Sequence, residues 1–324
     1  MKLKEISIQE IENIKIGQTE DVAGGTGCTV FISEEGMAAG LDVRGGGPAS
    51  RESELLKPLA AAQTIHAIVL SGGSAFGLDT GGGVMAFLEE KGIGYDVGVT
   101  KVPLVCQADL FDLTVADVKA RPDKKMGYEA AKIAMEASNY KDGNYGAGCG
   151  ATVGKINGME TCMKSGIGSY AVQIGPLKVG AVVAVNALGD IYDWKTGKKI
   201  AGLLSADRKS FSCTEDVLYN KADAVENLYA ENTTLGVVIT NASFNKSQLC
   251  KIAGMAQDGY ARSIRPVHTS ADGDSIFAVS VGQVKGDQDL VGTLAAQVMS
   301  EAVIRAIRSA EGAYGYPSVN ELDF

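Results

Sequence analysis

A hydroxyl residue stands at the boundary between a polar stretch and a strand-like stretch. Asn232, Thr233 and Thr234 lead directly into the apolar run at 235–240. A strand that begins with threonine can place its hydroxyl at the open end of a sheet. Threonine is a weak nucleophile without a nearby base, and the simplest base is its own α-amine. That amine exists only if the chain is cut between Asn232 and Thr233, and its ordinary pKa of roughly 7.7–8.0 suits a base near neutral pH.

Other interpretations of the reactive-looking residues are weaker. The Asn-Thr-Thr run is also typical of a turn before a strand, and it forms a glycosylation sequon. Ser74 follows a buried strand, but Phe76 occupies the position where a nucleophile elbow requires its second glycine. The glycines at 146–150 resemble a dinucleotide loop, yet no strand precedes them and no helix clearly follows.

The composition excludes several classes of protein. The 324 residues carry a net charge of −9 and no basic stripe, which argues against nucleic acid and membrane partners. Only two histidines occur, and none of the six cysteines forms a CxxC pair, so we expect no metal and no cofactor. No apolar leader and no run of about 18 apolar residues occurs, which predicts a cytoplasmic protein.

The hydrophobic pattern predicts one domain that mixes strands and helices. Strands are expected at 67–70, 166–174, 178–185 and 276–281, and helices near 126–137, 247–256 and 289–309. Residues 28–32 and 37–43 are predicted to form a hairpin with its turn at 34–36. The loop Arg44-Gly45-Gly46-Gly47-Pro48 implies that its backbone lies close to a neighbouring strand or to a substrate.

Several blocks together resemble the DmpA-like L-aminopeptidase/D-esterase family, in family order and over nearly the whole chain. These blocks are Gly25–Val30, Val43–Pro48, Leu70–Leu78, Gly146–Lys155 and Asn232–Ala242. The resemblance implies an α+β fold, a four-layer αββα sandwich that forms a single domain over 1–324. It also implies self-cleavage into an α chain, 1–232, and a β chain, 233–324, and assembly of these αβ units into a homo-oligomer.

The resemblance also assigns roles to individual residues. Thr233 matches the N-terminal nucleophile, and Asn186 matches an asparagine of the oxyanion hole. The loop Asp272-Gly273-Asp274 matches a site loop that reads Ser-Gly-Glu in better-known members, and Phe111 stands near the position of an active-site tyrosine. Backbone amides of the 146–150 loop, including that of Gly148, are expected to bind the substrate by holding the oxyanion together with Asn186.

The implied activity is hydrolysis of N-terminal amino-acid amides, esters or short peptides. Asp272 or Asp274 would accept the ammonium group of the substrate. From the residues alone, Asn186 can equally form an Asx turn, and the Asp-Gly-Asp loop can be a plain turn. Two alternatives stay open: an acyltransferase similar to ornithine acetyltransferases, and a non-catalytic homologue that is never cut.

Overall fold

The computed structural model describes residues 2–220 and 232–322 of the chain. Its main strands follow one hydrogen-bonded path, β1-β11-β12-β15-β17-β3-β5-β8-β4, and β2 pairs with β3. The strands are β1 (Lys4–Ile6), β2 (Lys15–Asp21), β3 (Thr26–Val43), β4 (Ala49–Arg51), β5 (Ile65–Ser71), β8 (Val105–Asp109), β11 (Ile167–Ile174), β12 (Leu177–Asn186), β15 (Thr233–Ala242) and β17 (Ser275–Val284). The helices are α1 (Thr80–Glu90), α2 (Lys124–Glu136), α3 (Thr214–Asn220), α4 (Lys246–Ser263) and α5 (Gln288–Arg308).

Short ladders complete the fold at the edges of the sheets. They are β6 (Tyr95–Asp96) with β7 (Lys101–Val102), β9 (Thr152–Val153) with β10 (Met163–Lys164), and β13 (Asp190–Tyr192) with β14 (Lys199–Ala201) and β16 (Ile264–Arg265). The β9–β10 ladder matters for the site, because it follows the glycine-rich segment 146–151 directly.

The predicted hairpin at 28–43 is wrong, because β3 is one continuous strand of 18 residues. Its first half pairs with β2 and β5, and its second half pairs with β17. The expected turn at 34–36 is instead an irregularity in the β3–β5 register between Ile32 and Met37, where Gly36 has a φ of +83°. Strand partners on both halves outweigh the local turn preference, and β3 passes from one sheet into the other.

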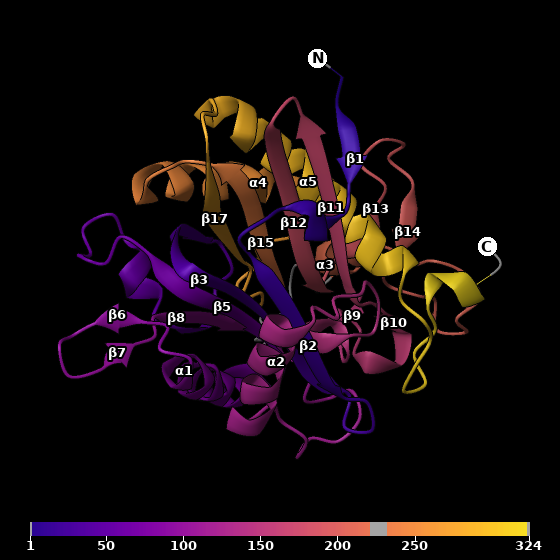
Figure 1. The fold of residues 1–324 in the computed structure, drawn as a ribbon. Helices are drawn as coiled ribbons and strands as arrows, with labels where there is room; N and C mark the ends of the chain where they lie inside the picture. Colours follow the sequence, from indigo (N-terminus) through magenta and orange to yellow (C-terminus); the bar gives the residue numbers. More distant parts are fainter. Residues whose placement is uncertain (1, 221–231, 323–324) are drawn as a thin grey trace.

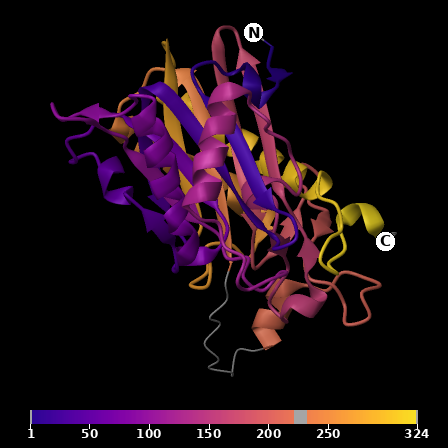
Figure 2. The same cartoon turned by 60° about the horizontal axis from the view of Figure 1, so that its bottom comes forward.

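The strands form two sheets that pack face to face, with a helix layer on each outer side. Alternate residues of each strand face opposite sides. In β12, Val182 faces the other sheet while Val183 faces α4 and α5; in β5, Ile68 faces the other sheet while Val69 faces α1 and α2. Figures 1 and 2 show α1 and α2 on one side and α4 and α5 on the other. The four-layer αββα sandwich is therefore confirmed.

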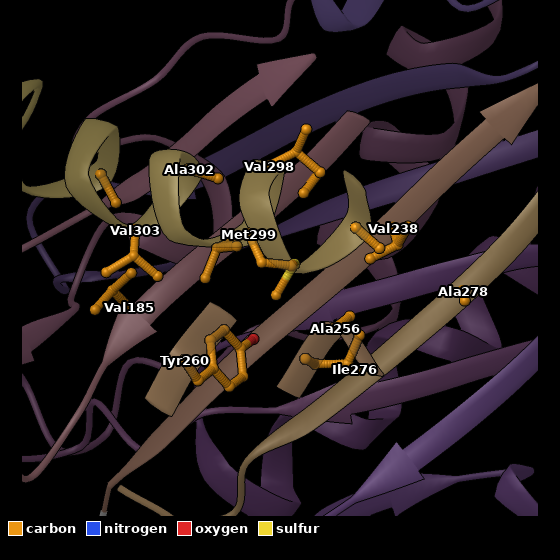
Figure 3. Packing of buried hydrophobic residues seen from close by; sticks show 14 of the residues in the cluster. Val185, Val238, Ala256, Tyr260, Ile276, Ala278, Val298, Met299, Ala302 and Val303 are labelled. Atoms are coloured by element: carbon orange, nitrogen blue, oxygen red, sulfur yellow. The ribbon is translucent and has the colours of Figure 1, made fainter. Parts of the chain in front are cut away.

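The packing between β15 and the helices fixes the strand that carries Thr233. Tyr260 of α4 and Met299 of α5 pack over Val238 and its neighbours, as Figure 3 shows. Gly236 permits this approach, because a Cβ atom there would lie 2.6 Å from both Met299 Cε and Tyr260 Oη. On both edges β15 has partners, β12 antiparallel and β17 parallel. Because β15 is buried on both faces and paired on both edges, its first residues are held in a fixed position.

Candidate active site

Thr233 is the first residue of β15, and only 4% of its surface is exposed. Its hydroxyl group donates a very short hydrogen bond to the carbonyl oxygen of Asn232. The same oxygen accepts a 2.9 Å hydrogen bond from the backbone N–H of Gly273. The hydroxyl therefore lies against the peptide bond predicted to be cut, and an N–H group already polarises that carbonyl. The segment 221–231 that leads to Asn232 lies outside the described residues.

Asn186 is the last residue of β12 and lies opposite Thr233 in the antiparallel ladder. Its side chain is fully buried, and its neighbours fix how the amide is turned. The Nδ2 group donates to the carbonyl oxygen of Phe111 at 2.8 Å, and Oδ1 accepts from the backbone N–H of Thr152 at 3.1 Å. One Nδ2 hydrogen is used by Phe111, so the amide has one more to offer.

Lys155 is a site residue that the sequence analysis missed. Its Nζ atom donates to Oδ1 of Asn186 at 2.8 Å and to the backbone oxygen of Asn186 at 3.0 Å. The residue before it, Gly154, has a φ of +77°, and a Cβ there would lie 2.1 Å from the backbone of Gly202. This tight turn directs Lys155 toward Asn186. In the sequence, the only signal is a glycine-rich segment that ends in a lysine, and such a segment is equally typical of an exposed turn.

The loop Asp272-Gly273-Asp274 lies directly beside Thr233. Asn232 and Asp272 form an isolated parallel bridge, which continues the β15–β17 pairing past the start of both strands. A Cβ atom at Gly273 would lie 2.6 Å from Oγ1 of Thr233. Glycine is therefore the residue that lets this loop approach the hydroxyl.

Asp274 holds the beginning of β15 in place. Its Oδ1 atom accepts from the backbone N–H of Thr234 at 2.8 Å. Its Oδ2 atom accepts from the backbone N–H of His268 at 3.1 Å and lies 2.9 Å from Nδ1 of the same histidine. His268 is the second site residue that the sequence analysis missed. Both oxygens of Asp274 are thus engaged by the protein.

Asp272 is buried to a similar degree but is bound differently. Its Oδ2 atom accepts hydrogen bonds from the backbone N–H and the hydroxyl of Thr269. Burial, followed by the nearby charge of Asp274, raises the pKa of Asp272 to about 6. Asp272 is therefore mostly ionised at neutral pH and mostly neutral in mild acid.

The glycine loop at 45–47 packs against the Asp-Gly-Asp loop and binds its backbone. Gly46 N–H donates to the carbonyl oxygen of Thr269 at 3.2 Å, and Gly47 N–H donates to that of Asp272 at 2.9 Å. A Cβ atom at Gly45 would lie 2.3 Å from the Asp272 carbonyl oxygen. The sequence left open whether this loop approaches a strand or a substrate, and in the structure it approaches the loop of the site.

Two predicted substrate contacts take other places in the structure. Gly148 is buried, its N–H donates to the carbonyl oxygen of Tyr145 at 2.9 Å, and a Cβ there would lie 2.2 Å from the backbone nitrogen of Ile167. Its amide is used within the loop, so we no longer assign it as an oxyanion donor. Phe111 reaches the site through its carbonyl oxygen, which orients the Asn186 amide.

Comparison with known proteins supplies the family. The sequence model described as peptidase family S58 matches residues 7–319. An uncharacterized aminopeptidase of Mycobacterium leprae is 34% identical over 96% of this chain and 92% of its own. A 6-aminohexanoate-oligomer endohydrolase of Agromyces is 28% identical over 92% of this chain and 84% of its own.

A solved structure agrees with the fold. The L-aminopeptidase D-Ala-esterase/amidase of Ochrobactrum anthropi, described as a variant of the Ntn hydrolase fold, superposes with a TM-score of 0.67. The match covers 94% of this chain and 86% of that one at 16% identity. The family match over nearly the whole chain, together with the curated aminopeptidase relative, shows that this chain is a hydrolase that belongs to peptidase family S58.

Proposed function

We propose that the chain cuts itself between Asn232 and Thr233 and then acts as an amidase or aminopeptidase with Thr233 as N-terminal nucleophile. The observation that carries this proposal is the contact between the Thr233 hydroxyl and the Asn232 carbonyl, whose oxygen also accepts the Gly273 N–H. A nucleophile against a polarised carbonyl is the arrangement that acyl transfer requires.

The cutting step converts the Asn232–Thr233 amide into an ester. Oγ1 of Thr233 attacks the carbonyl carbon of Asn232, and negative charge develops on the oxygen held by Gly273 N–H. The C–N bond then breaks, and the proton from the hydroxyl leaves with the nitrogen as the new α-amine. Water hydrolyses the ester, which releases the carboxylate of Asn232 and restores the hydroxyl of Thr233.

In the cut enzyme the α-amine of Thr233 serves as the base. It takes the proton of the Thr233 hydroxyl during attack on a substrate and later gives it to the leaving amine. Asn186 Nδ2, whose orientation Phe111 and Lys155 fix, donates its second hydrogen to the developing oxyanion. Because these donors are oriented before the substrate arrives, little reorganisation is needed during the reaction.

The substrates that fit this site best are short peptides and amides of amino acids with a free amino group. The buried carboxylate of Asp272 is the counter-charge that we assign to the substrate ammonium. Asp274 already holds the start of β15 and His268, whereas Asp272 is bound by Thr269 of its own loop and by the backbone of Leu188. The names of the relatives above, an uncharacterized aminopeptidase and a 6-aminohexanoate-oligomer endohydrolase, support this class of substrate. We further propose that the αβ units assemble into a homo-oligomer.

The mass and N-terminal sequence of the purified protein test the proposal. Two fragments of roughly 24 and 10 kDa are expected from the chain lengths, the smaller beginning at Thr233. Thr233→Ala should abolish both cutting and hydrolysis, whereas Thr233→Ser should still cut because serine keeps a hydroxyl.

Thr234→Ala is the matched control, because adjacent residues of a strand face opposite sides and only Thr233 can carry the new amine. A folded Thr233→Ala protein that still cuts would contradict the assignment. Release of acetate from acetylornithine by the wild type would favour the acyltransferase alternative.

A further inference from the structure

Lys164 is a buried cation that the proposed reaction leaves without a role. It lies in β10, has no exposed surface and forms no ion pair with any carboxylate in the described part of the chain. Its Nζ atom donates instead to three backbone carbonyl oxygens, those of Gly148 at 3.3 Å, Ala151 at 3.1 Å and Ser165. Burying a charged group without a carboxylate partner costs free energy of folding. A role in the site would explain why a lysine stands at this position despite that cost.

Two of the three carbonyl groups that Lys164 binds, those of Gly148 and Ala151, belong to the segment that orients Asn186. Ala151 directly precedes Thr152, whose N–H and hydroxyl both contact Oδ1 of Asn186, at 3.1 and 3.4 Å. The same segment continues to Lys155, the other donor to Oδ1. The ladder between Thr152 and Lys164 joins the two strands at this point.

We propose that Lys164 is a positioning residue of the active site: its ammonium group ties down residues 148–151, and these hold the Asn186 amide opposite Thr233. This role rests on the proposed function, in which Asn186 stabilises the oxyanion. Lys164 does not touch the reacting atoms. It acts through Ala151 and Thr152.

The protonation state of Lys164 determines how many of these carbonyl groups it can bind by hydrogen bonds. An ammonium group has three hydrogens for three acceptors, whereas a neutral amine has only two. Burial lowers the pKa of Lys164 to about 7, and the groups that face it, Cys149, Asp112 and Cys162, offset part of that shift. As the pH rises through about 7, Lys164 loses one of its three hydrogen bonds to these carbonyls, and its hold on the segment weakens.

Lys164→Gln tests the role because glutamine keeps two N–H donors but carries no charge at any pH. Lys246→Gln is the matched control: Lys246 is also buried and also donates to two backbone carbonyls, those of Ala60 and Ala62, but it lies in α4 outside this segment. The readout is the ratio of the kcat of each variant to that of the wild type. The α-amine of Thr233 titrates in all three proteins, so its effect cancels.

The kcat ratio for Lys164→Gln should be about one tenth or less near pH 6 and should approach one near about pH 8.5, where wild-type Lys164 is neutral too. The loss should stay below the roughly 100- to 1,000-fold cost of removing an oxyanion donor itself. Lys246→Gln should give a ratio near one throughout. A Lys164→Gln ratio that is low but independent of pH, or close to one near pH 6, would overturn the proposal. The rate of self-cutting of each variant is also divided by that of the wild type. A variant that is cut slowly, and therefore yields little active enzyme, can still be compared in this way.

Hydrogen exchange separates this inference from the proposed function. Lys164→Gln and Lys164→Met should both speed the exchange of backbone amides in 149–155, while Lys246→Gln should not. A wild-type chain that is never cut and hydrolyses nothing would overturn the proposed function, and the exchange comparison would then decide the Lys164 assignment by itself. Equal exchange in all variants would remove Lys164 from this role.

Discussion

Asn186 and Thr233 lie directly opposite each other, as the last residue of β12 and the first residue of β15. The two side chains therefore belong to the same end of the sheet, although they are 47 positions apart in the sequence. Because an antiparallel ladder fixes this register, backbone hydrogen bonds hold the proposed nucleophile and the proposed oxyanion donor opposite each other. The proposed reaction centre is thus positioned by the pairing of β12 with β15.

The first prediction concerns the donor role of Asn186. Asn186→Asp keeps the size of the side chain and an oxygen for Lys155, but it removes the Nδ2 donor. We expect kcat to fall by roughly 100- to 1,000-fold, with a much smaller change in KM, because the lost contact strengthens in the transition state. Rates of amino-acyl p-nitroanilide hydrolysis are normalised to the fraction of cut chain.

Asn241→Asp is the control for this substitution, since Asn241 lies at the other end of β15. Among the described residues, its side chain is hydrogen-bonded to Lys178 N–H at the start of β12 and to the carbonyl of Pro176 just before that strand. It should leave kcat nearly unchanged. Wild-type kcat in a folded Asn186→Asp enzyme would show that the oxyanion is held elsewhere.

The second prediction concerns the close approach of Gly273. A methyl group at Gly273 would lie 2.6 Å from Oγ1 of Thr233 and 2.9 Å from the carbonyl oxygen of Gly47. One of these neighbours must move, and a displacement of about 1 Å at a reacting group can cost about 100-fold. Gly273→Ala should therefore slow self-cutting by a factor of ten or more, measured as conversion of newly synthesised chain.

Gly47→Ala is the natural comparison, because within the described part of the chain a Cβ there would meet just the Asp272 carbonyl oxygen, at 3.9 Å. Alanine also keeps the N–H that binds this carbonyl. Cutting at the wild-type rate is expected. If both variants cut equally fast, the hydroxyl does not depend on the approach of Gly273.

The sequence predicts the strand that starts at Thr233 because the change from polar to β-branched residues is local. It also predicts the four layers, although only through the family resemblance. It fails at 28–43, where the turn signal of Glu34, Glu35 and Gly36 is outweighed by strand partners that lie far away in the sequence.

The site residues that the sequence did not predict were missed for the same physical reason. Lys155 is a site residue because it contacts Asn186, 31 positions later in the sequence. Nothing in the local sequence around Lys155 distinguishes it from a surface lysine. His268 lies near Asp274 in sequence, but its contact depends on a backbone φ of +60°, which the sequence does not disclose. Contacts set by register and backbone conformation are read only from the fold.

The third prediction separates the two acids of the Asp-Gly-Asp loop. Asp272→Asn should lower the catalytic efficiency for substrates with a free amino group by roughly 10- to 150-fold, since a charge-assisted hydrogen bond contributes about 1.5–3 kcal/mol. It should affect N-acetylated substrates much less, because they carry no ammonium. Asp274→Asn should instead slow cutting and impair both kinds of substrate alike, because Asp274 holds Thr234 N–H and His268.

The pH dependence of substrate selectivity tests whether Asp272 acts as a charge. Selectivity is measured as the ratio of the catalytic efficiency for a substrate with a free amino group to that for its N-acetylated form. The titration of the Thr233 amine cancels in this ratio. With a pKa of about 6, Asp272 is ionised above that pH and neutral below it, so the wild-type ratio should fall as the pH drops from about 7 to about 5. Asp272→Asn should give a low ratio that does not change with pH. The raised pKa of Asp272 also means that the folded state holds this proton more tightly than the unfolded state. The contribution of Asp272 to the free energy of unfolding is therefore fully present below the ordinary pKa of 3.8 and is lost as the pH rises through about 6. A wild-type ratio that stays constant across this range would show that the ammonium is recognised by another group.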